Sequence, residues 1–330
     1  MKKISFSLIS SFLGIVLFFW LFNRVEWQMV KNIFLRLSVI EGIFLLVLTA
    51  LGMLLGTLRW KEILKSKGYH FSLKELYGHY LAASAITYLT PMFVFGGEIF
   101  RGYVFNAKGE NPTSLEKAMA ASFTDTIFEC IFGCAAICLG AILFFFTAGF
   151  TLGDSQTMVL TISLLLAGGI FCFFIFKKKS IIKIFLKVDE QNRGRRVEKE
   201  ILSFFKIKNR SFQKVFLISF FKTSVRFFQY WLLVDFLGKS ISLLTAISVL
   251  GFSILFMGVP ISADFGSHDL GSAVLFGKLG LGLEVGAVFA SIVRGINLIL
   301  AIIGLLFLSK FGIEFLQNNL LKKIKRLFQK

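Results

Sequence analysis

The sequence predicts an all-α polytopic membrane protein with seven to eight transmembrane helices and one or two re-entrant segments broken by Pro and Gly. Three observations predict this class. Of the 330 residues 56% are hydrophobic and 17% are charged, and the mean hydropathy is +0.77, whereas a soluble domain has about 45–50% apolar and about 25% charged residues. The apolar residues form runs of about 20, the length of a helix that spans a bilayer. The 42 Phe residues can face lipid, where a helix can be apolar all round.

Seven apolar runs are each predicted to cross the membrane. A basic start, Met1-Lys2-Lys3, precedes the first run, but no small-residue cleavage site follows it, so we interpret this run as a retained helix and not as a signal peptide. Two further stretches, 80–100 and 261–283, are apolar but are interrupted by Pro, Gly and charged residues. The seven predicted crossings are 5–22, 40–58, 118–148, 157–176, 215–237, 243–259 and 285–308.

The basic residues predict the orientation in a cell (cytoplasmic) membrane. Thirteen Lys or Arg and four acids lie within 177–214, and the positive-inside rule places this loop and the N-terminus in the cytoplasm. The basic loop 59–67 is also expected inside, whereas 151–156 carries only Asp154 and is expected outside. The stretch 80–100 must then enter and leave on the cytoplasmic side as a re-entrant hairpin. The side of the C-terminus stays open, because 261–283 can either re-enter or cross.

One transmembrane domain is expected over 1–330, with halves at about 1–176 and 215–310 joined by the basic loop 177–214. No Walker loop, dinucleotide fingerprint, nucleophile elbow or kinase signature occurs, and no cofactor is expected. The net charge of +18 is interpreted as cytoplasmic loops facing anionic lipid; without a nucleic-acid motif, nucleic acid is not an expected partner. Three cysteines spaced four apart are interpreted as packing residues, and no metal site is predicted: Cys130, Cys134 and Cys138.

The two broken stretches share a pattern of Pro, then Gly five or six residues later, then an acid. Pro ends a helix and Gly lets the chain turn, and backbone amides freed at such a break must line a protein-walled or wet cavity. Two such breaks in opposite halves are typical of an internal repeat whose broken helices meet near the membrane centre, where a half-helix start favours an anion. The alternative is that both Pro residues only end helices at the membrane surface. The residues concerned are Pro91, Gly97, Glu98 and Arg101 in the first stretch, and Pro260, Gly266 and Asp269 in the second.

Charged residues inside apolar runs form a second group of candidates, because charges at membrane depth are costly and usually mark a working site. Glu98 and Arg101 are three apart and can pair across one helical turn. Asp125 and Glu129 share one face of a helix, and Arg294 lies well inside 285–308. We expect Arg294 to pair with Asp125 or Glu129. A purely structural ion pair remains an equal alternative for these residues.

Several of these residues carry a resemblance to a family. The segment Leu58-Arg59-Trp60-Lys61-Glu62-Ile63-Leu64 is followed by Phe71-Ser72-Leu73, Thr90-Pro91, Gly97-Glu98 and Arg101, then by Asp125 with Glu129, by Pro260, Gly266 and Asp269, and by Arg294. Over nearly the whole chain this order resembles the transmembrane, flippase-like domain of lysylphosphatidylglycerol synthases and its stand-alone relatives. Thr90 and Asp269 depart from the family pattern, which has Leu and Glu there. The resemblance implies translocation of a lipid or lipid-linked glycan between leaflets, without the soluble synthase domain.

The leading hypothesis is a flippase-like or scramblase-like translocase for an anionic phospholipid or a polyprenyl-phosphate-linked substrate. Arg101, Arg294 and half-helix amides would bind phosphate, while Glu98, Asp125, Glu129 and Asp269 would balance charge, bind a cationic headgroup or carry protons. Two alternatives remain: a membrane transferase that modifies lipids, and an accessory subunit whose basic cytoplasmic loops bind a protein partner. The absence of a recognisable donor site in the loops favours a transporter over an enzyme. The predicted translocation site comprises Pro91, Gly97, Glu98, Arg101, Asp125, Glu129, Pro260, Gly266, Asp269 and Arg294.

Overall fold

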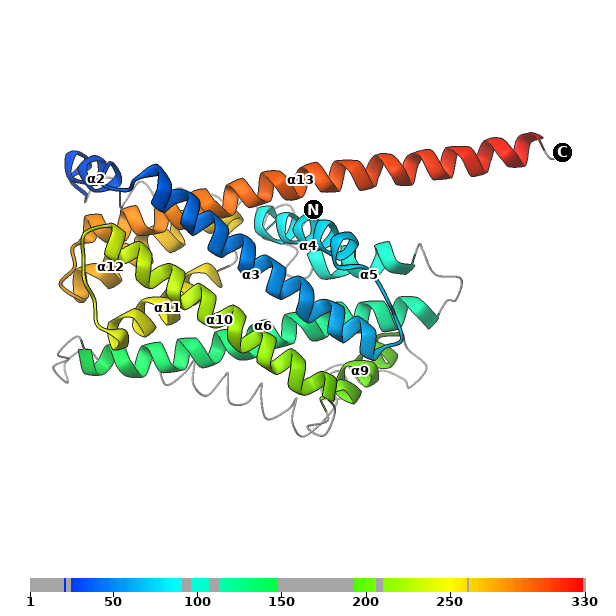
Figure 1. The fold of residues 1–330 in the computed structure, drawn as a ribbon, viewed down its shortest axis with the longest axis horizontal. Helices are drawn as coiled ribbons and strands as arrows, with labels where there is room; N and C mark the ends of the chain where they lie inside the picture. The colour runs from blue at the N-terminus through cyan, green and yellow to red at the C-terminus, as the bar shows by residue number, and fades with distance from the viewer. Residues whose placement is uncertain are drawn as a thin grey trace, which may run out of the picture.

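The computed structural model describes Leu21 and residues 25–90, 96–106, 113–147, 193–205, 210–259 and 261–328. Within these residues the chain forms ten α-helices and one 3₁₀ turn, with no strand (Figure 1), so the predicted all-α class is confirmed. The elements are α2 (Trp27–Phe34), α3 (Val39–Ser66), α4 (Leu73–Leu89), α5 (Gly96–Asn106), α6 (Thr113–Thr147), α9 (Arg193–Phe204), α10 (Arg210–Phe236), α11 (Leu243–Met257), η1 (Ser262–Asp264), α12 (Ser267–Lys278) and α13 (Leu283–Phe328).

Three of the described helices contain segments that are long and apolar enough to cross a membrane. These segments are Val39–Ser66, Leu115–Phe144 and Leu283–Phe311, and they correspond to the predicted crossings at 40–58, 118–148 and 285–308. They identify a multi-pass membrane protein. The helix α3 continues through Ser66, so most of the predicted basic loop 59–67 is in fact helical; Lys and Arg are good helix formers, and basic sequence alone does not end a helix.

The remaining predicted crossings have different outcomes. The helix α11 has 15 residues, fewer than the roughly 20 that span a bilayer. The helix α10 has 27 residues but carries Lys222 and Arg226 near its middle. The crossings predicted at 5–22 and 157–176 lie outside the described residues, Leu21 apart. The number of crossings and the re-entrant course of the broken stretches stay predictions.

Two parts of the chain repeat one order of elements. The order α3, α4, α5, α6 is followed after α9 by α10, α11, α12, α13, and in each set a break separates the second helix from the short third helix. The turn after the first helix is built alike in both sets. Gly68 and Gly238 adopt φ values of +91° and +82°, which glycine reaches without steric cost. Four residues later Ser72 and Ser242 accept a backbone N–H through their side chains and begin the next helix.

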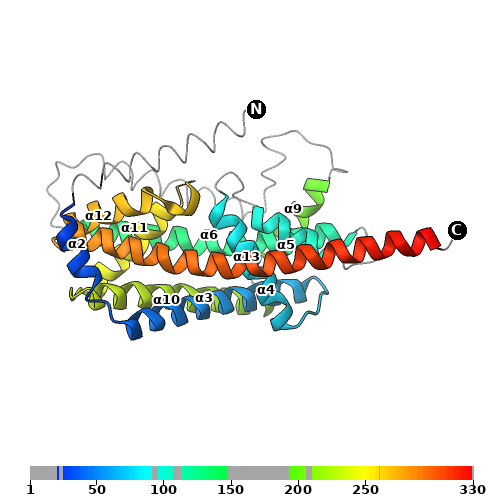
Figure 2. The same cartoon turned by 90° about the horizontal axis from the view of Figure 1, so that it is seen from above.

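The two sets of helices interlock. The helix α4 packs on α13, and reciprocally α11 packs on α6 (Figure 1). The helices α3 and α10 are antiparallel neighbours in a layer of their own (Figure 2): the Gln229 amide donates to Thr49 Oγ1 at 2.6 Å near one end, and Arg59 Nη1 donates to Ser219 Oγ at 3.4 Å near the other. Helices from both halves therefore surround the space between them.

The crossing of α6 and α11 depends on glycine. A Cβ built on Gly140 would lie 2.9 Å from the Gly251 Cα and 2.9 Å from the Ile247 carbonyl oxygen, whereas one built on Gly133 of the same helix would meet its nearest neighbour, the Ile254 Cγ2, at 3.5 Å. The backbones of the two helices are thus in direct contact, as is common where membrane helices pack through small residues.

We expect Gly140→Ala to lower the free energy of unfolding by about 1–3 kcal/mol, because backbone atoms cannot move aside for the added methyl group. Gly133→Ala is the matched control: the same substitution in the same helix should be neutral or stabilise by up to about 1 kcal/mol, since alanine has the better helix propensity. Thermal unfolding of the purified variants in detergent measures both. Equal stability of the two variants would contradict the close crossing.

The predicted basic loop 177–214 contains a packed helix. The helix α9 contacts α6, and Lys67 Nζ at the end of α3 pairs with the Glu200 carboxylate at 2.6 Å. Phe204 and Phe205 follow and are buried against Phe128 of α6. Part of this loop is therefore a fixed element of the structure.

Candidate functional site

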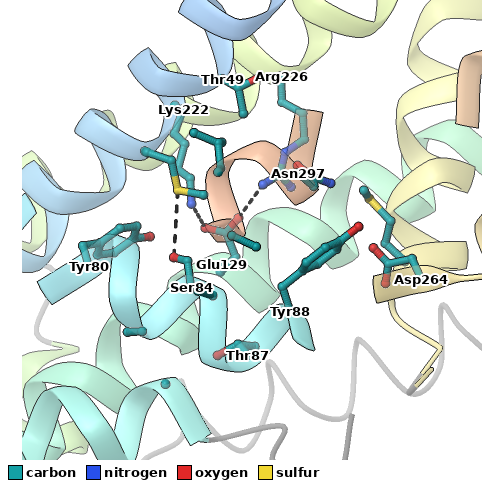
Figure 3. A pocket seen from close by; sticks show the side chains of 18 of the residues that line it. Thr49, Tyr80, Ser84, Thr87, Tyr88, Glu129, Lys222, Arg226, Asp264 and Asn297 are labelled. Atoms are coloured by element: carbon teal, nitrogen blue, oxygen red, sulfur yellow. Dashed lines mark hydrogen bonds and ion pairs between the residues drawn. The ribbon is translucent and has the colours of Figure 1, made fainter. Parts of the chain in front are cut away.

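A cavity of about 540 Å³ lies where the two halves meet. Its wall is formed by α3, α4, α5, α6, α10 and α13 and by the segment between α11 and α12 (Figure 3). Both halves therefore contribute to one space, and charged side chains gather in its wall. The charged lining residues are Arg59, Glu98, Arg101, Asp125, Glu129, Lys222, Arg226 and Asp264.

Asp125 of α6 joins two arginines from different helices. Its Oδ1 accepts from Arg59 Nε of α3 at 2.6 Å, and its Oδ2 accepts from Arg101 Nη1 of α5 at 2.8 Å. All three residues are buried, with at most 4% of their surface exposed. One carboxylate balances only one of the two guanidinium charges, so the two arginines need further acidic partners in this low-dielectric environment.

Glu129 lies one turn further along α6 and collects three cations. Arg59 Nη2 donates to it at 2.9 Å, Lys222 Nζ at 2.5 Å and Arg226 Nη2 at 3.1 Å. Figure 3 shows the side chains of Lys222 and Arg226 converging on Glu129. Because Arg59 bonds both acids, Asp125 and Glu129 do not simply repel each other; they are held together by a shared arginine.

The first broken stretch completes the cluster. Glu98 Oε1 accepts from Thr126 Oγ1 at 2.7 Å and lies 3.5 Å from Arg101 Nη2, so the predicted pairing of Glu98 with Arg101 is confirmed. The Arg101 guanidinium also lies 4.9 Å and 5.2 Å from the ring centroids of Trp60 and Tyr80. Contacts of this kind between a cation and an aromatic face stabilise the charge once it is removed from water.

The cluster has four cations and three acids, a difference of +1: Arg59, Arg101, Lys222 and Arg226 against Glu98, Asp125 and Glu129. Its members differ in access to the cavity. The side chains of Arg59 and Arg101 are 2% and 5% exposed, whereas those of Lys222 and Arg226 are 11% and 36% exposed. Among the four cations of this cluster, Arg226 and Lys222 of α10 are therefore the most accessible.

The second broken stretch holds a separate ion pair. Arg294 of α13 donates to Asp269 of α12, which also accepts the Gly266 N–H at 3.0 Å, and the Arg294 guanidinium lies 4.9 Å from the centroid of the Phe265 ring. The expectation that Arg294 pairs with Asp125 or Glu129 is wrong. The helix α13 packs on the short helix of its own half, and Asp125 already has its two partners from α3 and α5.

The predicted site residues thus fall into three groups. Gly97, Glu98, Arg101, Asp125 and Glu129 line the cavity. Gly266, Asp269 and Arg294 are brought together beside it but are not among its described lining residues. Pro91 and Pro260 lie outside the described residues.

The site predicted from the sequence leaves out four charged lining residues, Arg59, Lys222, Arg226 and Asp264. Arg59 was assigned to a cytoplasmic loop because it precedes other basic residues. Lys222 and Arg226 offered a signal, since a spacing of four inside an apolar run places both cations on one helix face. Asp264 precedes the glycine of the second break, whereas the pattern of Pro, Gly and acid points to Asp269, which follows it.

A comparison with known protein families covers most of the chain. A family model described as "Lysylphosphatidylglycerol synthase TM region" matches residues 7–304. The matched range contains both broken stretches and every charged residue of the cavity. No curated protein matches the chain.

Proposed function

Because this chain belongs to the family of the lysylphosphatidylglycerol synthase TM region, a family of lipid-related membrane proteins, we propose that it moves a lipid with an anionic, phosphate-bearing headgroup between the leaflets of the cell membrane. One observation carries the proposal: the described wall of the cavity between the halves holds a connected cluster of four cations and three acids, and the fourth acid of the wall, Asp264, has no ion pair to that cluster.

The charge balance favours an anionic headgroup. A phosphodiester carries one negative charge, which matches the excess of one positive charge in the cluster. A charged group that crosses hydrocarbon alone meets a large desolvation cost, and fixed cations in a cavity lower that cost by replacing the lost hydration. Acyl chains can stay in the bilayer, since the outer surface of α3 exposes apolar side chains such as Val39, Ile40 and Ile43.

The proposal keeps the predicted orientation, with the N-terminus and the loop 177–214 in the cytoplasm. Two sources provide the same headgroup chemistry: a diacyl phospholipid and a polyprenyl-phosphate-linked carrier. The phosphate is the shared recognition element, and transport assays with each lipid distinguish them.

Arg226→Gln tests the role of the accessible cations. The substitution removes a donor from the cavity but leaves Glu129 paired with Arg59 and Lys222, so the fold should be retained. We expect translocation of a fluorescent anionic phospholipid in vesicles to slow by about tenfold or more, as for loss of one charge-assisted hydrogen bond of about 1.5–3 kcal/mol.

Arg210→Gln is the matched control, because Arg210 is an exposed residue at the start of the same helix and does not line the cavity. The control should move lipid at the wild-type rate. Equal rates for both variants at equal reconstitution would remove Arg226 from headgroup binding, and turnover of lipid into a new product by the wild-type protein would favour a transferase.

A further inference from the structure

A single carboxylate, that of Asp264, reaches the cavity from the break between α11 and α12. Figure 3 shows Asp264 apart from Glu129 and from the two partners of Glu129 on α10, Lys222 and Arg226. The Tyr88 ring extends from α4 toward Asp264. The cavity therefore has a cationic cluster in one part of its wall and an isolated acid in another.

The backbone holds Asp264 in an unusual conformation. Ala263 and Asp264 adopt φ values of +53° and +54°, and they are the two described residues other than glycine with positive φ. Each costs of order 1–3 kcal/mol in this region and persists only where the surroundings impose it. Here the Tyr88 hydroxyl donates to the Ala263 carbonyl at 3.2 Å, and the Asp264 N–H donates to the Ile261 carbonyl at 3.2 Å. The backbone conformation at Asp264 is thus held by contacts within the fold.

Asp264 differs from the other acids of this region in its partners. Glu98, Asp125, Glu129 and Asp269 each pair with an arginine. The Asp264 carboxylate has neither a hydrogen bond nor an ion pair to any residue that the structure describes, and only longer-range electrostatic interactions reach it. An acid without a direct counter-ion in largely apolar surroundings is the one whose charge can change at least cost.

The groups that face Asp264 come from every described element packed against it. These elements are α4, α12 and α13; Tyr88, Asp269 and Arg294 on them, and Tyr230 of α10, lie within electrostatic range of Asp264, and His268 of α12 lies within range of Arg294. The Arg294 and Asp269 charges oppose each other as an ion pair. Both ring nitrogens of His268 are buried without a hydrogen-bond partner in the described part of the chain. Arg294 and Asp269 thus act on Asp264 in opposite senses, and a charge that enters the cavity adds to their effect.

From this geometry we propose that Asp264 takes up a proton when an anionic headgroup occupies the cavity and releases it when the headgroup leaves, so that lipid and proton cross together. The inference rests on the proposed function. The negative headgroup repels the Asp264 carboxylate and favours its neutral form, and by linkage protonation of Asp264 strengthens headgroup binding by the same factor. The headgroup then crosses with its negative charge balanced by the cationic cluster and with Asp264 in its neutral, protonated form.

The test uses purified full-length protein in vesicles that contain a fluorescent anionic phospholipid. With one proton carried per lipid, a pH difference should shift the leaflet ratio of the lipid toward the alkaline side, with a limit of about tenfold per pH unit. Asp264→Asn should abolish this shift, whereas the control Asp235→Asn, at an exposed position on α10, should keep it. A leaflet ratio in Asp264→Asn that still follows the pH difference would overturn the inference and leave the proposed function standing.

Three further arms complete the test. If Asp264→Asn moves no lipid, proton uptake is measured with a pH indicator in weakly buffered detergent solution: the wild-type protein should take up a proton on addition of the anionic phospholipid and the variant none, and equal uptake would contradict the proposal. A leaflet ratio that follows a sodium gradient at constant pH would replace the proton by a metal cation. Absence of any lipid movement by wild-type protein would remove the proposed function and the inference together.

Discussion

Asp125→Asn is expected to lower the free energy of unfolding by about 3–5 kcal/mol, the range for breaking a buried ion pair. Asn keeps the size of the side chain but removes the charge that Arg59 and Arg101 share at 2.6 Å and 2.8 Å. Both guanidinium groups are almost completely buried, so water cannot replace the lost partner. Arg59 retains Glu129, whereas Arg101 keeps only Glu98, at 3.5 Å, as an acidic partner among the described residues.

Thermal unfolding in detergent, followed by size-exclusion chromatography of heated samples, measures the effect. Asp235→Asn is the control, because it makes the same chemical change at an exposed position of α10, and it should shift the unfolding temperature little. Equal unfolding temperatures for the two variants would show that the ion pairs of Asp125 with Arg59 and Arg101 do not hold α3, α5 and α6 together.

The second large effect is expected at the ion pair of the other half. Asp269→Asn and Arg294→Met should each destabilise the protein by roughly 2–4 kcal/mol, somewhat less than Asp125→Asn, because Arg294 is 14% exposed. Asn at position 269 can still accept the Gly266 N–H, so the start of α12 should be retained and the charge alone is tested.

A double-mutant cycle separates pairing from other effects. The combined variant removes both charges, and its cost should fall short of the sum of the two single costs by about 1–3 kcal/mol. Unfolding temperatures of the four proteins give this difference. Additive single effects would mean that Asp269 and Arg294 do not pair in the folded protein.

The elements that could be predicted from the sequence depend on local chemistry. Runs of apolar residues predicted α3, α6 and α13, and the Pro and Gly residues predicted breaks after α4 and α11. The pair Glu98–Arg101 also followed from spacing, because residues three apart on a helix are neighbours.

The partners of Arg294 and Arg59 could not be predicted in the same way. Which helices pack together is a tertiary property, and an arginine inside an apolar helix can pair with any acid at its depth. The sequence predicts the acids of α6 as partners of Arg294, whereas the packing of α12 on α13 brings it to Asp269. Arg59 continues a helix beyond the predicted span, and its burial depends on the acids of α6 that accept its hydrogen bonds.

Asp264 shows a different limit of prediction from sequence. Its placement depends on positive φ values at two consecutive residues, Ala263 and Asp264. The sequence does not predict this conformation, which non-glycine residues rarely adopt. In the sequence pattern of Pro, Gly and acid, the acid after Gly266 is Asp269, and Asp264 lies before that glycine. Only the arrangement of the cavity wall distinguishes this acid from its paired neighbours.

The measurement that tests the central claim most directly is the movement of fluorescent lipids between leaflets in vesicles with purified wild-type protein, compared with empty vesicles. Our account predicts protein-dependent movement of anionic phosphate-bearing lipids, phospholipid or polyprenyl-linked, and slower movement of a lipid without phosphate. Movement no faster than in empty vesicles for every phosphate-bearing lipid tested would contradict it.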